Sequence, residues 1–245
     1  MSKHIAIVPA RSGSTRLKDK NFSKIGDLTL VEWCIYKLVG TNLFDKVIIS
    51  TDSDKLDALP KNAKIMVKKR QANLADNKTP VLKTILSLAE QFEFAETISY
   101  FLPTCPFIGL KSIREGFNHL LNNQDTNSVS VAEYSEIPQL ACKLTNHKEL
   151  IPIFDNLSLG MTNSNYLPKF CRPTGGFYMG YRSNILKNKS YFNGSKTAGI
   201  MTSQLEAHDI NTKFDLLHAQ SLYQNEKKLL DLHCNLVSLK KNHLS

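Results

Sequence analysis

The 245-residue sequence lacks the features typical of a secreted or membrane-spanning protein. It has only five cysteines, an odd number with no CxxC pair, which argues against a disulfide framework and against a structural zinc site. The longest apolar run near the N-terminus covers residues 5–10, too short for a signal-peptide core or a membrane span. We therefore expect a cytoplasmic protein whose cysteines are reduced.

Motifs that define several enzyme classes are also missing. The sequence contains no GxxxxGK[ST] phosphate loop, no GxGxxG dinucleotide fingerprint and no GxSxG nucleophile element. Its seven histidines form no pair with metal-ligand spacing. Nucleophilic hydrolase chemistry and a histidine-based metal site are therefore unsupported.

The sequence does contain enough hydrophobic residues, 42%, for a large core. Short β-rich runs alternate with segments of helical period, which predicts an α/β domain with a largely parallel sheet. We expect strands at residues 4–10, 45–52, 64–68, 97–106, 127–135, 175–180 and 206–212, and helices at residues 27–40, 79–92, 112–121 and 211–223. Gly40 should end the first helix, and the last should bury Phe214, Leu217 and Leu222.

The chain has no internal repeat or low-complexity linker, so we predict a single domain over residues 1–245. The pattern becomes irregular at about residues 135–175, where residues 143–154 look like an antiparallel hairpin. The tail, residues 226–245, reads as a basic amphipathic helix. We expect this helix to pack on its own domain, with a second subunit as the alternative.

The formal net charge of +9 raises the question of what the basic residues bind. Residues 10–21, ARSGSTRLKDKN, follow the first strand and combine a Ser-Gly-Ser backbone with four cationic side chains. Ligands of open α/β sheets bind beyond the carboxyl ends of strands, so this loop can form a phosphate cradle. A solvated surface is the alternative. We expect Arg11 and Lys20 to bind, and Arg16 and Lys18 to be solvated neighbours.

Other strand ends also offer polar groups. Asp52 can accept hydrogen bonds or cap a helix. Asp209 can hold a hard cation such as magnesium beside phosphate oxygens, although Asp209 and Asn211 are equally suited to a turn and a helix cap. Lys169 and Arg172, next to two glycines, can grip a carboxylate or mark a bend in a strand.

Taken in order, seven segments resemble the CMP-sialic acid synthetase family, the acylneuraminate cytidylyltransferases. They are IAIVPARSGSTRLKDKN (5–21), VIISTDSDKL (47–56), RQANLAD (70–76), LPTCP (102–106), IPQLACKL (137–144), LPKFCRPTGGFYM (167–179) and HDINTKFDL (208–216). The resemblance implies a Rossmann-like three-layer nucleotidyltransferase fold, with a small β-rich dimerisation embellishment at about residues 135–175. It also implies a homodimer that transfers CMP from CTP to a sialic-acid-like ulosonic acid with Mg²⁺ and releases pyrophosphate.

The resemblance also assigns roles to individual residues. It places Ala10, Arg11, Ser12, Gly13, Lys20, Asn21 and Arg70 at the nucleotide, with Arg11, Lys20 and Asp209 as the catalytic residues. It places Leu102, Lys143, Arg172, Thr174, Gly175 and Tyr178 at the sugar, and Asp209 and Asn211 at the metal.

Several positions depart from the family pattern. Leu102 stands where the family usually has glutamine, and Thr174 where it has asparagine. Asn211 replaces the second aspartate of the usual DID, and Asn77 and Lys78 replace an Asp-Thr pair. Lost side-chain amides remove hydrogen bonds that select substituents, so we expect a sugar acid other than N-acetylneuraminate. The missing charge at Asn211 predicts weaker magnesium affinity.

Three other interpretations remain open. One is a related sugar nucleotidyltransferase with another sugar or nucleotide, although Asn21 after Lys20 favours the sialic acid branch. A second is a catalytically impaired relative that binds nucleotide. The third is a nucleic-acid-binding protein, because residues 61–70 carry five cationic side chains and no acid. No helix-turn-helix, RNP motif or zinc finger accompanies them, so we expect no nucleic acid and no membrane partner.

Overall fold

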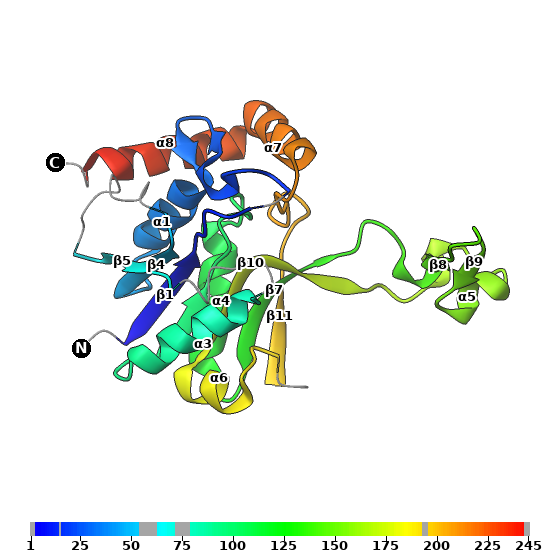
Figure 1. The fold of residues 1–245 in the computed structure, drawn as a ribbon, viewed down its shortest axis with the longest axis horizontal. Helices are drawn as coiled ribbons and strands as arrows, with labels where there is room; N and C mark the ends of the chain where they lie inside the picture. Colours follow the sequence, from blue (N-terminus) through cyan, green and yellow to red (C-terminus); the bar gives the residue numbers. More distant parts are fainter. Residues whose placement is uncertain (1–2, 15, 54–62, 72–78, 193–195, 243–245) are drawn as a thin grey trace.

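A seven-stranded sheet forms the centre of the computed structural model, which describes residues 3–14, 16–53, 63–71, 79–192 and 196–242 (Figure 1). Its strands are, in spatial order, β11 (Thr197–Met201), β7 (Asn127–Glu133), β10 (Cys171–Tyr181), β6 (Thr97–Tyr100), β1 (His4–Pro9), β4 (Lys46–Thr51) and β5 (Ile65–Lys69). All neighbouring strands are parallel except β10, which runs antiparallel to β6 and β7. The predicted, mostly parallel sheet is confirmed.

Strand β1 lies inside the sheet because it is apolar on both faces. Ile5 and Ile7 enter one core, Ala6 and Val8 enter the other, and all four side chains are fully buried. β1 pairs in parallel with β4 and β6. The carboxyl ends of these three strands therefore meet at one edge of the sheet, where ligands bind in open α/β folds.

Helices cover both faces of the sheet. α3 (Val81–Gln91) and α6 (Arg182–Asn188) contribute to one core, and α1 (Leu30–Thr41) and α4 (Leu110–Asn122) to the other. α7 (Lys213–Asn225) and α8 (Lys227–Asn242) pack outside α1, together with a short hairpin of β2 (Lys24–Ile25) and β3 (Leu28–Thr29). The predicted three-layer, Rossmann-like fold is confirmed (Figure 1).

Helix α1 does not end at the residue that the sequence predicts. Thr29 and Glu32 form a capping box at its start, and the helix ends at Asn42 in the left-handed conformation. Gly40 lies inside the helix, so the prediction that it ends α1 is wrong. A Cβ atom at Gly40 would lie 2.9 Å from Leu239 Cδ1, so glycine here allows α8 to approach α1 closely.

The tail helix α8 packs on its own domain, as predicted. Leu229 and Leu236 are 3% and 2% exposed within the core formed with α1 and α7. Leu232 and Leu239 are partly buried against the same core. At the far end of α8, Lys240 forms an ion pair with Glu32 of α1.

One predicted strand and one predicted helix face are wrong. Residues 206–212 form turns and coil, and the strand at the sheet edge is β11, whose small residues gave too weak a pattern to predict. In α7, Phe214 and Leu217 are 76% and 54% exposed, because Ala219 and Leu222 form the face that packs on the core.

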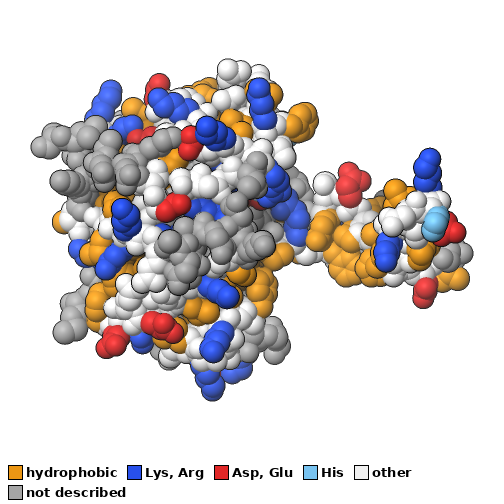
Figure 2. Space-filling view, in the orientation of Figure 1, with side chains coloured by type: hydrophobic (Ala, Val, Ile, Leu, Met, Phe, Trp, Pro, Cys, Tyr) orange, Lys and Arg blue, Asp and Glu red, His pale blue; other side chains and the backbone are white. Residues whose placement is uncertain are grey.

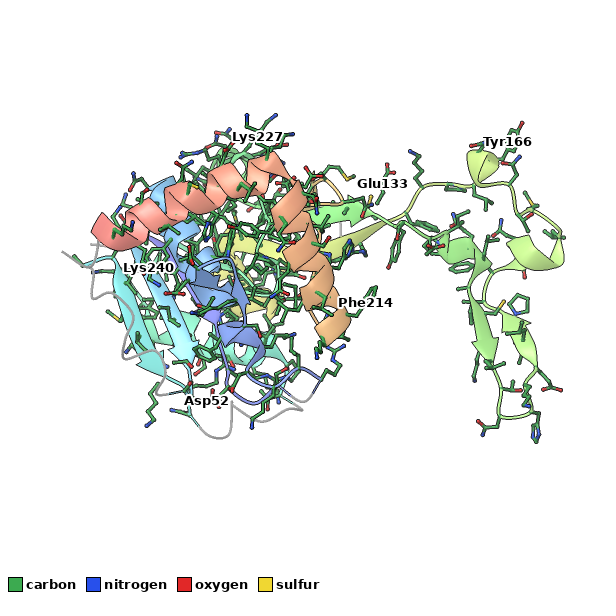
Figure 3. All side chains as sticks on the ribbon, turned by 90° about the horizontal axis from the view of Figure 1, so that it is seen from above. Asp52, Glu133, Tyr166, Phe214, Lys227 and Lys240 are labelled. Carbon is green, nitrogen blue, oxygen red and sulfur yellow. The ribbon has the colours of Figure 1, made fainter. Side chains whose placement is uncertain are left out.

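The chain between β7 and β10 forms an arm, residues 134–170, that projects from the body (Figures 1 and 3). It contains the predicted antiparallel hairpin, formed by β8 (Cys142–Leu144) and β9 (Leu150–Pro152), together with the short helix α5 (Asp155–Ser158). Figure 3 shows Glu133 at the base of the arm and Tyr166 on its distal part. Within the described segments, no helix is long and apolar enough to cross a membrane.

Candidate active site

A cavity of about 390 Å³ lies at the edge of the sheet where β1 and β6 end. Residues that follow β1, β5 and β6 line it, together with the start of α3 and the segment before α7. The lining residues are Pro9, Arg11, Ser14, Arg16, Lys20, Asn21, Arg70, Thr79, Val81, Leu102, Pro103, Thr104, Asp209 and Asn211. Seven of them were predicted as site residues from the sequence: Arg11, Lys20, Asn21, Arg70, Leu102, Asp209 and Asn211.

The loop after β1 is held in place by hydrogen bonds at both ends. The backbone N–H and hydroxyl of Ser12 donate to the two carboxylate oxygens of Asp52 at 2.7 and 2.9 Å. Burial alone would raise the pKa of Asp52, but these hydrogen bonds hold it below its usual value. At the other end, Asn21 Nδ2 donates to the carbonyl oxygen of Arg11 at 2.9 Å. The loop is thus shaped before any ligand arrives.

Two predicted residues of this loop act through the backbone. Ala10 is fully buried, and its N–H donates to the carbonyl oxygen of Ser50 at 2.9 Å. Gly13 is exposed at the turn of the loop. Ser12, tied to Asp52, belongs to the frame of the loop and does not line the cavity. These residues therefore set the backbone path that places the cationic side chains.

The cationic side chains of the cavity are positioned by neutral partners. Lys20 Nζ donates to Asn211 Oδ1 at 3.1 Å, and Arg70 Nη2 donates to the carbonyl oxygen of Ser50 at 3.0 Å. Burial lowers the pKa of Lys20, although Asp209 opposes this shift. Burial also lowers the pKa of Arg70, against the effect of Asp52. Because neither cation forms an ion pair among the described residues, both can attract an anionic ligand.

The segment before α7 supplies the acidic part of the cavity. The N–H of Ile210 donates to the carbonyl oxygen of Thr104 at 2.8 Å, which fixes the segment against the end of β6. Asp209 Oδ2 accepts a hydrogen bond from Asn211 Nδ2 at 2.6 Å. Asp209 is the only carboxylate among the described lining residues, which include four cationic side chains.

The donor set fits a metal ion only in part. The described part of the chain contains no group of three or more His, Cys, Asp or Glu side chains that could hold a metal ion. Magnesium commonly binds through one or two carboxylates together with substrate phosphates, so Asp209 suits an ion that arrives with a nucleotide. The side-chain oxygen of Asn211 already accepts hydrogen bonds from Arg16 and Lys20.

Of the six residues predicted to bind the sugar, only Leu102 is among those that line the cavity. Gly175 supports it from behind, with φ at +83°, and a Cβ atom there would lie 3.0 Å from Leu102 Cδ1. Thr174 is 3% exposed, and its hydroxyl donates to Ser130 Oγ at 2.7 Å inside the sheet. Thr174 was predicted to lie at the sugar, but in this structure its hydroxyl is bonded inside the protein and does not line the cavity.

The other predicted sugar residues lie outside this cavity. Tyr178 is stacked on Tyr100, with ring centroids 4.4 Å apart. Arg172 Nη2 donates to the carbonyl oxygen of Ala207 at 3.4 Å, which links β10 to the segment before Asp209. Lys143 is exposed on β8 in the arm, away from the cavity of its own chain (Figure 1).

Sequence reasoning assigned Arg16 no role at the site, and it offered Asp52 only as a hydrogen-bond acceptor or a helix cap. Arg16, expected to be a solvated neighbour, lines the cavity, and its Nη2 donates to Asn211 Oδ1 at 3.0 Å. Asp52 does accept hydrogen bonds, and it holds the loop through Ser12. Arg16 belongs to the first of the seven matching segments, residues 5–21, and this position was a signal that could have indicated it. The altered positions Asn77 and Lys78 lie outside the described residues.

The comparisons with known proteins identify a family for this chain. A family model described as cytidylyltransferase matches residues 5–167, about two thirds of the chain. The N-acylneuraminate cytidylyltransferase of Escherichia coli is 25% identical over 236 residues, covering 96% of this chain and 56% of that protein. The chain thus spans little more than half the length of this relative. The CMP-N,N'-diacetyllegionaminic acid synthase of Legionella pneumophila is 24% identical, covering 92% of this chain and 98% of that protein.

A solved structure shares the fold. CMP:2-keto-3-deoxy-manno-octonic acid synthetase complexed with CTP matches with a TM-score of 0.66 at 14% identity, covering 92% of this chain and 100% of the other. An identity this low supports the fold alone. The match of the family model over about two thirds of the sequence shows that this chain belongs to the cytidylyltransferase family.

Proposed function

We propose that this enzyme transfers CMP from CTP to a sialic-acid-like nonulosonic acid and releases pyrophosphate, for the biosynthesis of a surface polysaccharide or another glycan. The observation that carries the proposal is the convergence of Arg11, Lys20 and Arg70 on one cavity, which Asp209 also lines. A triphosphate is the ligand that such a set of cations recognises most strongly. The proposal places the reaction in the cytoplasm, where CTP is available.

In the proposed reaction, the anomeric hydroxyl oxygen of the sugar attacks the α-phosphorus of CTP. A new C–O–P linkage forms, the bond between the α-phosphorus and the bridging oxygen breaks, and pyrophosphate leaves with the electron pair. The hydroxyl proton passes to solvent. Catalysis of this kind depends on alignment and on neutralising the charge that moves to the leaving group. Lys20 and Arg11 supply that positive charge from a loop already held in shape.

A divalent cation belongs to the same proposal. Magnesium that enters with the triphosphate would be held by Asp209 and would supply further charge neutralisation. The role of Asp209 in the chain itself is to place a negative oxygen in the cavity close to Lys20. Its hydrogen bond from Asn211 Nδ2 fixes the orientation of that carboxylate.

We propose that the sugar acid differs from N-acetylneuraminate. Leu102 presents an apolar side chain to the cavity, and Thr174 keeps its hydroxyl inside the sheet. Neither side chain can donate an amide hydrogen bond to a sugar substituent. A pocket without these donors discriminates less by hydrogen bonding and favours an acid with apolar groups at these points.

Pyrophosphate release tests both parts of this proposal. We expect release with CTP and magnesium for at least one acid in a panel of N-acetylneuraminic, legionaminic, pseudaminic and Kdo-type acids, and slower release with UTP, ATP or GTP. N-acetylneuraminate should not be the best substrate. If a folded preparation releases no pyrophosphate with any acid, the proposed activity is refuted; preference for N-acetylneuraminate refutes only the proposed sugar.

We also propose that the enzyme works as a homodimer joined through the arm. The arm exposes many large apolar side chains, which a monomer would leave in water (Figure 2). Those at least half exposed are Leu144, Leu150, Ile153, Leu159 and Tyr166. A second copy is the partner that explains both this surface and the position of Lys143, which can serve the partner's sugar site.

Mixing two defective variants tests the shared site. Lys20→Met removes a cation from the chain's own cavity, whereas Lys143→Met removes the residue supplied to the partner. Each variant alone should be nearly inactive. After subunit exchange, half of the dimers are mixed and each has one intact site, so activity should return to about a quarter of the wild-type value. A monomer by light scattering, or no recovery after proven exchange, would contradict the proposal.

A further inference from the structure

The side-chain amide of Asn211 connects two cationic residues of the loop after β1 with Asp209. Its Oδ1 accepts hydrogen bonds from Arg16 Nη2 at 3.0 Å and from Lys20 Nζ at 3.1 Å. Its Nδ2 donates to Asp209 Oδ2 at 2.6 Å. Its own N–H donates to Asp215 Oδ2 at 3.0 Å, so the backbone at this position is fixed at the start of α7. One neutral side chain thus orients two cations and one carboxylate.

The neutrality of Asn211 decides what these cations can do. A carboxylate at this position would form ion pairs with Arg16 and Lys20 and would satisfy their charge within the protein. The neutral amide oxygen orients Arg16 and Lys20 by hydrogen bonds without cancelling their charges, so both charges remain available to a ligand. A guanidinium also matches the oxygens of a phosphate through two parallel hydrogen bonds. Arg16 therefore has the chemistry and the position of a phosphate ligand.

We propose that Arg16, oriented by Asn211, binds the triphosphate. Its positive charge takes the place of a divalent cation, which a second carboxylate at position 211 would otherwise help to hold. This inference rests on the proposed use of CTP. The described residues that line the cavity offer only one carboxylate, Asp209, for a metal ion. Arg16 carries a permanent positive charge. With an aspartate at position 211, the positive charge at this point would have to come from a bound metal ion.

The proposal predicts CTP binding that depends little on divalent cations. In calorimetric titrations with EDTA present, wild type should bind CTP within about tenfold of its affinity in magnesium. Arg16→Gln should weaken CTP binding in EDTA by about tenfold or more, the effect of losing a charge-assisted contact. Lys18→Gln is the matched control, because it removes the same charge from an exposed residue of the same loop that does not line the cavity.

Asn211→Asp should reverse this behaviour. The new carboxylate should pair with Arg16 and weaken CTP binding in EDTA, and magnesium should then restore it by a larger factor than in wild type. Titration of Mn²⁺ alone, followed by electron paramagnetic resonance, should show affinity at least about tenfold tighter in Asn211→Asp than in wild type. One oxygen of the new carboxylate then pairs with Arg16, and the other replaces Nδ2 beside Asp209, where both carboxylates can bind the ion. Thermal melting of each variant establishes that it is folded.

The outcomes separate this inference from the proposed function. If wild type binds no CTP even with magnesium, the proposed function fails first. If wild type binds CTP with magnesium but loses it in EDTA, or if Arg16→Gln binds as tightly as Lys18→Gln, then Arg16 does not have the proposed role. If Asn211→Asp binds Mn²⁺ no more tightly than wild type, the amide at position 211 does not weaken metal binding, and that part of the proposal is overturned.

Discussion

Replacing Lys20 with methionine should lower kcat/KM for CTP by about 10²- to 10³-fold, the effect of losing one preorganised charge at a site of developing negative charge. Methionine keeps most of the length of the side chain and removes the ammonium group. Lys20 Nζ lies in a half-buried position, held by Asn211 Oδ1 and facing the cavity. Because water screens the charge less there than at the surface, no exposed lysine of the loop can substitute for it.

Steady-state pyrophosphate release measures this effect, and Lys18→Met is the control. Lys18 lies two residues away and is exposed, so its replacement should change kcat/KM by less than about threefold, as surface charges are screened by solvent. Both variants should melt within a few degrees of wild type. Equal losses in the two variants would mean that the loop acts through its overall charge, and the specific role of Lys20 would then be rejected.

Replacing Asp209 with asparagine should lower kcat by about 10²-fold, because it removes the only carboxylate among the described residues that line the cavity. The side chains have the same shape, so the hydrogen bond to the Asn211 side chain can persist after an amide rotation. The magnesium concentration needed for half-maximal activity should rise, whereas CTP affinity without magnesium should hold or improve. Removing a negative charge close to Lys20 cannot weaken the attraction of this lysine for phosphate.

Kinetics as a function of magnesium concentration test this prediction. Asp231→Asn serves as the control, because Asp231 is exposed on α8 and does not line the cavity, and its replacement changes net charge by the same amount. It should leave kcat and the magnesium requirement unchanged. If Asp209→Asn retains full activity at the wild-type magnesium concentration, Asp209 is not the residue that holds the ion.

The fold and the cationic loop after β1 could be predicted because both follow from local patterns. β1 is apolar on both faces, which is the pattern of a strand inside a parallel sheet, and its loop carries its cations within a short stretch. Arg11, Lys20 and Asn21 do line the cavity. The amphipathic spacing of α8 also predicted its packing on the domain, with Leu229 and Leu236 buried.

The sugar side could not be predicted in the same way, because side-chain direction there depends on an irregular strand. The pairing of β10 with β7 shifts register between Pro173 and Tyr178, and Gly175 within this bulge has a positive φ. A bulge interrupts the alternation of faces, so residue spacing no longer tells which side chains point outward. Thr174 turns into the sheet for this reason, and Lys143 is carried away from the cavity by the arm.

The sequence by itself determined the layered α/β fold, the cationic loop after β1 and the acidic residue before α7, because each is encoded in a continuous segment. Only the tertiary structure decided how these segments act on one another. Asp52 reaches Ser12 across 40 positions of the chain, and Asn211 reaches Arg16 across 195. Parallel pairing brings the ends of distant strands to one edge of the sheet, and hydrogen bonds formed there select which cations face the ligand.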